Sequence, residues 1–337
     1  MPTTAPTSTM TAKERFYATL EGQPRDRAPV TPIVMQWAAD FIGRTYREYY
    51  LDGGVLAEAQ VAVAREFHTD WVSVMSDPWC EPSAYGMTFD YPEDATGVPR
   101  DHLVHSLDEA KQLPPLDLDD ERVQCRLRCI RDEVAAVGHT HPVVGWVEGP
   151  IAQYADLRGI QSAMMDLLDD VSGFHAVAEH LVSEAIRFSA VQVEAGADVI
   201  GVGDAAASIV GPQLYRDAVL PWEQKLIAGL HGLGAKVKLH ICGDLKPILA
   251  DVVTTGADII DLDSMVPIAD ARAASSDQVF AGNFDPAAVL LNGSPRDVQA
   301  AAERCLAEGG ERFMLQPGCE VPHGTPMDNM RAFCPGA

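Results

Sequence analysis

The chain has 337 residues, of which 47% are hydrophobic and 22% charged, a composition typical of a globular protein with a substantial core. Its formal net charge of −24 gives a surface that repels phosphate backbones and anionic membranes, so nucleic-acid and membrane partners are not expected. No stretch reaches the roughly 18 consecutive apolar residues of a membrane-spanning helix.

The first segment, MPTTAPTSTMTAKER, is rich in Thr and Pro and lacks the apolar core of a secretory signal. We expect residues 1–10 to be a disordered lead-in and residues 11–337 to form one catalytic domain. Thr11, followed three residues later by Glu14, is a candidate helix N-cap. The seven cysteines are odd in number, which together with the missing export signal favours a reducing, cytoplasmic location over a disulfide framework.

Apolar β-branched runs alternate with helical stretches from about residue 140 onward. Two earlier strands are predicted at residues 27–35 and 69–77, and residues 86–120 between them and the repeat look like an irregular excursion with a small hairpin. The later runs predict strands at residues 141–150, 197–204, 235–244, 257–265, 277–286 and 312–319.

Strict alternation of strands and helices implies a parallel sheet with right-handed crossovers. An open doubly wound sheet gathers ligands at a single switch point, whereas a barrel collects them from many strand ends. Polar residues do recur at the predicted strand ends: Glu148, Asp204, His240, Cys242, Asp244, Asp263, Asn283 and Cys319. The predicted fold class is therefore α/β, a single (β/α)8 TIM barrel.

His240 and Cys242 are two positions apart on one predicted strand, so both side chains should face the same side. Cys319 follows a later strand, whose end can converge on the same point. Two thiolates and one imidazole suit zinc, and three protein ligands leave one position open, as in catalytic sites. The alternative is a core histidine beside two buried thiols, and the spacing alone leaves both interpretations open.

Several carboxylates fall at the same predicted rim: Asp77, Glu81, Glu148, Asp204, Asp244 and Asp263. Such groups can bind a cation, act as acid or base, or complete a metal shell. They can equally cap the helices that follow, an alternative that applies most to Asp244. We expect Asp204, Glu148 and Asp77 to be the catalytic carboxylates.

Aromatic and amide side chains near the predicted mouth can line a substrate pocket, although such residues also serve as ordinary packing. From these and the strand-end residues we predict a substrate-binding set: Gln36, Trp79, Tyr85, Tyr154, Asp263 and Asn283. The chain has no phosphate-binding P-loop, no G-x-G-x-x-G after a strand, no H-E-x-x-H and no G-x-S-x-G. A nucleotide cofactor with its own pyrophosphate site is therefore not indicated.

Seven segments together resemble the uroporphyrinogen decarboxylase superfamily: RAPVTPIVMQW, SDPWCEPSAYGMTFDYPED, VEGPIAQYADLRG, AGADVIGVGDAAAS, LHICGDLKPILADVVTTGADIIDLD, AGNFDPAAVLLNGSP and LQPGCEVPHGTPMDNM. The resemblance runs from about residue 10 to the end and implies a (β/α)8 barrel. The H-x-C…C pattern resembles the zinc-dependent, corrinoid-linked methyltransferases, such as methylcobamide:coenzyme M methyltransferases and bacterial O-demethylase components. By that resemblance His240, Cys242 and Cys319 are the zinc ligands.

The same resemblance implies methyl transfer between a corrinoid (cobalamin) and a small substrate, which is a thiol, a methyl ether or amine, or tetrahydrofolate. Zinc would act as a Lewis acid, with Asp204 or Glu148 filling its open position at rest or serving as the acid. The chain has no D-x-H-x-x-G corrinoid-binding signature, so a separate corrinoid protein is the expected partner. A monomer and a homodimer both fit the resemblance.

A porphyrinogen decarboxylase is the main alternative, because Asp77 stands where that branch has the aspartate that contacts the substrate's pyrrole nitrogens. Against it, the region matching the arginine-rich motif of the decarboxylases has only Arg44 and Arg47, and Cys319 replaces their histidine. A chain of net charge −24 is also a poor host for a polycarboxylate substrate. A non-catalytic barrel with a structural zinc is a second alternative, although no third cysteine lies near to close the shell.

Overall fold

The computed structural model describes residues 9–334, so residues 1–8 of the predicted lead-in lie outside the described residues. One parallel sheet has the strand order β1-β4-β5-β6-β7-β8-β9. This sequential order is the one that right-handed β–α crossovers produce. The strand bounds are β1 (Val72–Ser73), β4 (Val143–Glu148), β5 (Val199–Gly203), β6 (Lys236–His240), β7 (Ile259–Leu262), β8 (Val279–Phe284) and β9 (Phe313–Pro317).

The segment around Val30 closes this sheet into a barrel. Val30 forms an isolated parallel bridge with Leu315 of β9, and its carbonyl accepts a hydrogen bond of 2.7 Å from Asp70 N–H, just before β1. The strand predicted at residues 27–35 is thus reduced to one bridging residue, because prolines on both sides cannot donate to a ladder. The predicted (β/α)8 TIM barrel is confirmed, with this segment in the place of the eighth strand.

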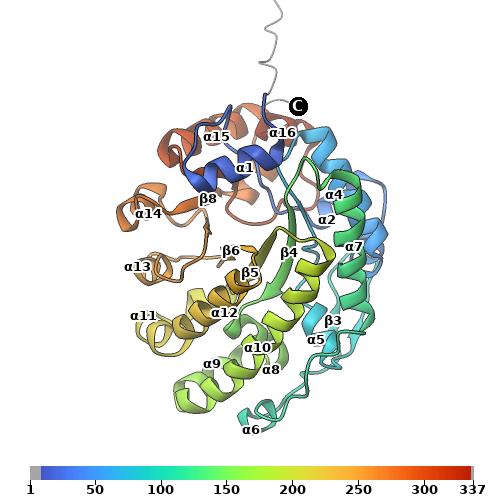
Figure 1. Cartoon of the computed structure of the whole chain (residues 1–337), viewed down its shortest axis with the longest axis vertical. Coiled ribbons are helices and arrows are strands. Elements are labelled where there is room, and N and C mark those ends of the chain that lie inside the picture. The colour runs from blue at the N-terminus through green and yellow to red at the C-terminus, as the bar shows by residue number, and fades with distance from the viewer. Residues whose placement is uncertain (1–8, 335–337) are drawn as a thin grey trace, which may run out of the picture.

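Helices form an outer ring around the strands (Figure 1). The longest, α10, buries residues at three- and four-residue spacing, such as Phe174, Val177 and Leu181, against the barrel. The bounds are α1 (Ala12–Glu21), α2 (Gln36–Phe41), α3 (Tyr46–Leu51), α4 (Gly53–Phe67), α5 (Cys80–Ala84), α6 (Leu107–Ala110), α7 (Glu121–Val137), α8 (Pro150–Arg158), α9 (Ile160–Asp169), α10 (Val171–Ala195), α11 (Pro212–Leu214), α12 (Leu220–Gly232), α13 (Leu249–Val252), α14 (Ile268–Ala274), α15 (Pro295–Gly309) and α16 (Met327–Phe333), with short 3₁₀ and π segments η1 (Ala205–Ile209), η2 (Tyr215–Val219) and η3 (Pro286–Leu291).

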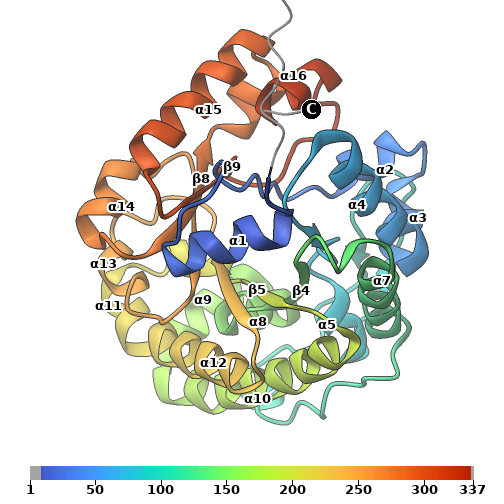
Figure 2. The same cartoon turned by 45° about the horizontal axis from the view of Figure 1, so that its top comes forward.

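Helix α1 lies across the N-terminal ends of the barrel strands (Figure 2). It begins at the predicted N-cap Thr11, whose side chain accepts from Glu14 N–H while Glu14 bonds back in a capping box. Lys13 reaches Asp198, just before β5, at 2.7 Å, and Arg15 pairs with Asp70, just before β1. With this end closed by a helix, the carboxyl ends of the strands form the open mouth.

The excursion predicted at residues 86–120 contains the antiparallel hairpin of β2 (Phe89–Asp90) and β3 (Val98–Pro99), as expected. One detail of the prediction is wrong, because β6 ends at His240 and Cys242 lies beyond it. No helix among residues 9–334 is both long and apolar enough to cross a membrane.

Candidate metal centre at the barrel mouth

The first component of the centre is His240, the last residue of β6. Its Nδ1–H donates to Asp261 Oδ2 of the neighbouring strand β7 at 2.7 Å. Its other ring nitrogen, Nε2, lies 3.9 Å from the Sγ of Cys319. The ring of Trp146 lies 6.3 Å away, centre to centre, and covers the imidazole from the β4 side.

The two thiols come from loops that follow β6 and β9 rather than from the strands. The chain turns directly after Cys242, where Gly243 has a φ of +96° and donates its N–H to Asp263 Oδ2 at 2.9 Å. Strand alternation therefore does not place Cys242, and this glycine turn does. Gly318 precedes Cys319 where an added Cβ would lie 2.5 Å from the backbone nitrogen of Ser264, so only glycine fits.

Cys242 and Cys319 lie in side-chain contact with each other. This contact lowers the pKa of Cys242, whereas the same contact, reinforced by burial, raises the pKa of Cys319 to about 12. Burial alone would lower the pKa of His240, but hydrogen bonds to Asp261 and Cys319 raise it to about 9. Cys242 is thus the thiol most ready to ionise, and Cys319 contacts both Cys242 and the imidazole of His240.

These residues fit zinc in donor type and in orientation. Tetrahedral bonds of about 2.3 Å to sulfur and 2.0 Å to nitrogen place the two ligand atoms about 3.5 Å apart, about 0.4 Å less than the observed 3.9 Å. A carboxylate on the far ring nitrogen is the usual partner of a metal-bound histidine. Among residues 9–334, however, no group of three His, Cys, Asp or Glu side chains already has the arrangement of a metal site.

A buried layer beneath His240 was not predicted from the sequence. Lys238 Nζ lies 2.8 Å from the Asp261 carboxylate, 3.3 Å from Gln316 Oε1 and 4.1 Å from the centre of the Trp71 ring. The signal available in the sequence was strand alternation, which places Lys238 and His240 on one face. Pairing of the adjacent strand then brings Asp261 to that face.

Two buried glutamates, Glu148 and Glu81, lie beside the centre at the end of β4. Glu148 accepts from Trp146 Nε1 at 3.1 Å, and its own N–H donates to Glu81 Oε1 at 2.9 Å. Arg126 lies 3.5 Å from the other oxygen of Glu81. Burial, followed by the charges of Asp156 and Glu81, raises the pKa of Glu148 well above its usual range. This shift favours the protonated form of the carboxyl.

The other two predicted catalytic carboxylates are held by protein groups. Asp77 is buried and ion-paired with Arg122; burial would raise its pKa, but Arg122 and Arg126 lower it. Asp204 is fully buried, and its Oδ1 accepts from Ala152 N–H at 2.7 Å. These contacts favour structural roles, Asp77 in joining β1 to α7 and Asp204 in anchoring the start of α8.

Two residues of the predicted substrate-binding set, Asp263 and Asn283, lie at the mouth and hold its loops through hydrogen bonds. Asp263 accepts from Gly243 and from Met265 N–H, the latter at 3.0 Å, so it fixes the Cys242 turn. Asn283 Nδ2 donates to the Val266 carbonyl at 2.6 Å and thereby holds the loop after β7. Their carboxylate and amide groups shape the mouth through the backbone.

The remaining four predicted substrate residues make their contacts elsewhere. Gln36 donates to the Asp94 carbonyl at 3.1 Å, and the ring of Trp79 packs 5.3 Å from that of Phe89. The ring of Tyr85 lies 6.0 Å from His180 of α10, and Tyr154 donates to Asp166 of α9 at 2.6 Å. These contacts tie both tyrosines to outer helices, and their role in substrate binding stays a prediction.

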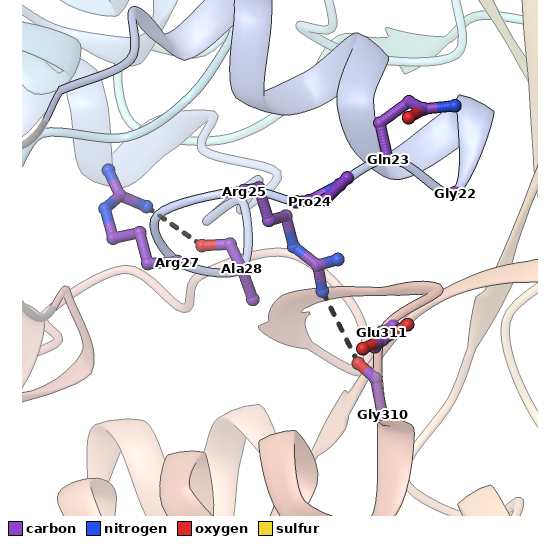
Figure 3. Close-up of a pocket in the computed structure, with 8 residues that line it drawn as sticks. All are labelled: Gly22, Gln23, Pro24, Arg25, Arg27, Ala28, Gly310 and Glu311. Carbon is purple, nitrogen blue, oxygen red and sulfur yellow. Dashed lines mark hydrogen bonds between the residues drawn. The ribbon is translucent and has the colours of Figure 1, made fainter.

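A separate pocket lies at the opposite end of the barrel (Figure 3). It measures about 390 Å³ and is lined by residues that precede the Val30 bridge and β9: Gly22, Gln23, Pro24, Arg25, Arg27, Ala28, Gly310 and Glu311. Arg25 donates to the Gly310 carbonyl at 3.4 Å, and Arg27 to the Ala28 carbonyl at 3.0 Å and to Asp70. This pocket contains none of the predicted site residues.

The structure defines a TIM barrel with a histidine and two cysteines at its mouth, and comparison with known proteins gives the family. The uroporphyrinogen decarboxylase (URO-D) family matches residues 11–335, so the chain belongs to that family.

Within the family, the chain is 29% identical to methylcobamide:CoM methyltransferase MtbA of Methanosarcina mazei, over 95% of this chain and 96% of the relative. It is 26% identical to uroporphyrinogen decarboxylase of Coxiella burnetii, over 95% and 93% of the two chains. A solved methyltransferase structure from Methanosarcina mazei superimposes with a TM-score of 0.87 at 25% identity, covering 96% of this chain and 97% of the other.

Proposed function

We propose that this chain is a zinc-dependent methyltransferase that moves a methyl group between a small substrate and a corrinoid carried by a separate protein. The observation that carries the proposal is the orientation of His240, whose Nδ1 is held by Asp261 while Nε2 faces Cys319. Full-length relatives named methylcobamide:CoM methyltransferases support it. The substrate is a thiol, a methyl ether or amine, or tetrahydrofolate.

His240, Cys242 and Cys319 would hold the zinc, and three protein ligands leave a fourth position for the substrate. Zinc, when bound, supplies a Lewis acid that lowers the pKa of a thiol or polarises a leaving heteroatom. The protein's own contribution is orientation. Asp261 fixes the imidazole ring, the Gly243–Asp263 hydrogen bond fixes the loop of Cys242, and Trp146 covers the imidazole on one side.

Glu148 is the proposed proton donor. Its Oε1 accepts from the Trp146 indole at 3.1 Å, so a proton on this carboxyl is carried by Oε2. Burial first, and then the charges of Asp156 and Glu81, raise the pKa of this carboxyl and so favour its protonated form. When a methyl group leaves an ether or amine, Oε2–H can protonate the departing oxygen or nitrogen.

The decarboxylase alternative requires Asp77 to be open to the substrate's pyrrole nitrogens. Asp77 is instead 1% exposed and paired with Arg122, with a further hydrogen bond of 2.9 Å from Trp79 N–H. A buried, neutralised carboxylate is a poor acceptor for a porphyrinogen. This observation favours the methyltransferase over the decarboxylase.

A spectrophotometric assay tests the proposal. Zinc-loaded protein is mixed with methylcobalamin and thiols such as coenzyme M and homocysteine, and separately with cob(I)alamin and methyl ethers, methylamines or methyl-tetrahydrofolate. One substrate class should change the cobalt absorbance with turnover, and Cys242→Ser/Cys319→Ser should lower the rate at least about 100-fold, as loss of a major catalytic group does. Absence of transfer with every class, or equal rates in the double variant, would contradict the proposal.

Glu148→Gln separates the two directions of transfer. With an ether or amine donor the rate should fall by about 100-fold or more, because a general acid contributes about 10²–10⁴-fold. With a thiol acceptor the rate should stay within about threefold, since no leaving group needs a proton. Equal losses in both directions would remove Glu148 from the role of acid.

A further inference from the structure

We infer that Asp261 and Lys238 form a positioning unit that presents His240 to the metal in one fixed tautomer and with balanced charge. The inference rests on the proposed zinc site and concerns residues beneath it. All three side chains lie on adjacent strands, β6 and β7, and the side chains of Asp261 and Lys238 are 1% and 0% exposed. The unit is therefore part of the barrel interior and closed to substrate.

The hydrogen bond to Asp261 selects the tautomer of His240. A carboxylate can only accept, so the ring proton on this side stands on Nδ1, 2.7 Å from Asp261 Oδ2. When the ring is neutral, as a metal-bound histidine must be, its lone pair is then on Nε2, the nitrogen that faces Cys319. The other oxygen, Asp261 Oδ1, is buried without a hydrogen-bond partner, so the carboxylate is directed toward His240 and Lys238.

Lys238 supplies the counter-charge. Its Nζ lies 2.8 Å from the same Oδ2 and 4.1 Å from the centre of the Trp71 ring. Zinc with two thiolates is neutral in sum, and so is Asp261 with Lys238, so the assembled centre leaves no net charge in the interior. A lone carboxylate or ammonium at this depth would be strongly destabilising.

The same chain provides a matched control at the other end of the same two strands. Asp258 accepts from His231 Nε2 at 2.8 Å and from Lys236 Nζ at 3.0 Å, a second histidine–aspartate–lysine group. The pairs there are partly exposed and lie at the N-terminal end of the barrel, away from the thiols. Removing either aspartate deletes contacts to one histidine and one lysine, and in Asp258 also a hydrogen bond of 2.8 Å from Val237 N–H. Only Asp261 lies behind a proposed metal ligand.

The experiment compares zinc affinity in Asp261→Asn and Asp258→Asn by competition with a chromophoric chelator. Asp261→Asn should weaken zinc binding about 10- to 100-fold, the usual effect of losing the partner of a metal-bound histidine. Asp258→Asn should bind zinc like the wild type. The visible spectrum of the cobalt(II)-substituted protein should also change in Asp261→Asn only, which a purely structural role would not produce.

A second variant keeps the test valid if Asp261→Asn fails to fold. In Lys238→Met/Asp261→Leu no unpaired charge is left in the interior, and such replacements of buried pairs are often tolerated. This variant should fold and show the same weakened binding. Wild-type affinity and an unchanged cobalt spectrum in both Asp261 variants would overturn the inference alone. A wild type that binds no zinc would overturn the proposed function, and this inference with it.

Discussion

The two histidine–aspartate–lysine groups lie at opposite ends of β6 and β7 and use identical residue types in different surroundings, with His231 of the base group coming from α12. At the mouth, the side chains of Lys238, Asp261 and His240 are 0%, 1% and 9% exposed, and the thiol of Cys319 lies next to the imidazole. At the base, His231 and Lys236 are 38% and 42% exposed. Burial and neighbouring side chains, rather than the three residue types themselves, therefore decide whether such a group can support a metal ligand.

The electrostatic surroundings of the two aspartates, Asp261 and Asp258, also differ between the mouth and the base of the barrel. Burial alone would raise the pKa of Asp261, but Lys238 and His240 lower it. Burial would likewise raise the pKa of Asp258, but the hydrogen bonds from Val237 N–H, His231 and Lys236 lower it. Because solvent screens the base group, its ion pairs should contribute little to stability, whereas the mouth group is screened hardly at all.

The largest effect should come from removing the thiols that distinguish the mouth group. Cys242→Ser/Cys319→Ser should lower the zinc content from about one per chain to below about 0.1, since only one strong ligand remains. Elemental analysis of purified protein measures this. Cys125→Ser, which changes a buried thiol in α7 that contacts the Tyr50 carbonyl, is the control and should keep full zinc content. Full zinc content in the double variant would disprove the ligand assignment.

The two lysines should differ next most strongly. Lys238→Met leaves the Asp261 carboxylate buried without its cation and should lower the free energy of unfolding by about 3–5 kcal/mol. Lys236→Met breaks an exposed pair and should cost less than about 1 kcal/mol. Urea unfolding of metal-free protein measures both values. Equal losses would mean that burial does not separate the two groups.

The smallest expected effect is the loss of the stability that Asp258 contributes when the pH becomes acidic. The pKa of Asp258 is lowered in the folded state, so its contribution to stability is present above the unfolded value of about 3.9 and is lost as pH falls through the folded value. Asp258→Asn should therefore be less stable than the wild type by under about 1 kcal/mol at pH 7. The difference should shrink as the pH falls below the unfolded value of about 3.9. Unfolding free energies measured across this range test it, and a difference that grows toward low pH would reverse the assigned sign.

The alternation of apolar runs and helical periods was enough to predict the barrel, because each later strand carries a continuous buried run. The proposed ligands His240, Cys242 and Cys319 rest on strand-end placement and family resemblance, and their role as ligands stays a prediction. The strand geometry assumed for Cys242 was wrong, because the chain leaves β6 at His240 and the left-handed turn at Gly243 orients the thiol.

Residues that act across the fold were harder to predict. The pairing of Asp261 with His240 depends on the register between β6 and β7, and the pairing of Asp77 with Arg122 joins positions 45 apart in sequence. The directions of Tyr85 and Tyr154 depend on how α5 and α8 rotate against outer helices. Composition and periodicity carry no information about such register and rotation.

X-ray absorption at the zinc edge of the zinc-loaded protein tests the central claim most directly, because it counts the atoms bound to the metal. We predict two sulfur atoms at about 2.3 Å and at least one imidazole nitrogen at about 2.0–2.1 Å, as Cys242, Cys319 and His240 would supply. Zinc surrounded only by nitrogen and oxygen, or a protein that retains no zinc, would contradict the account.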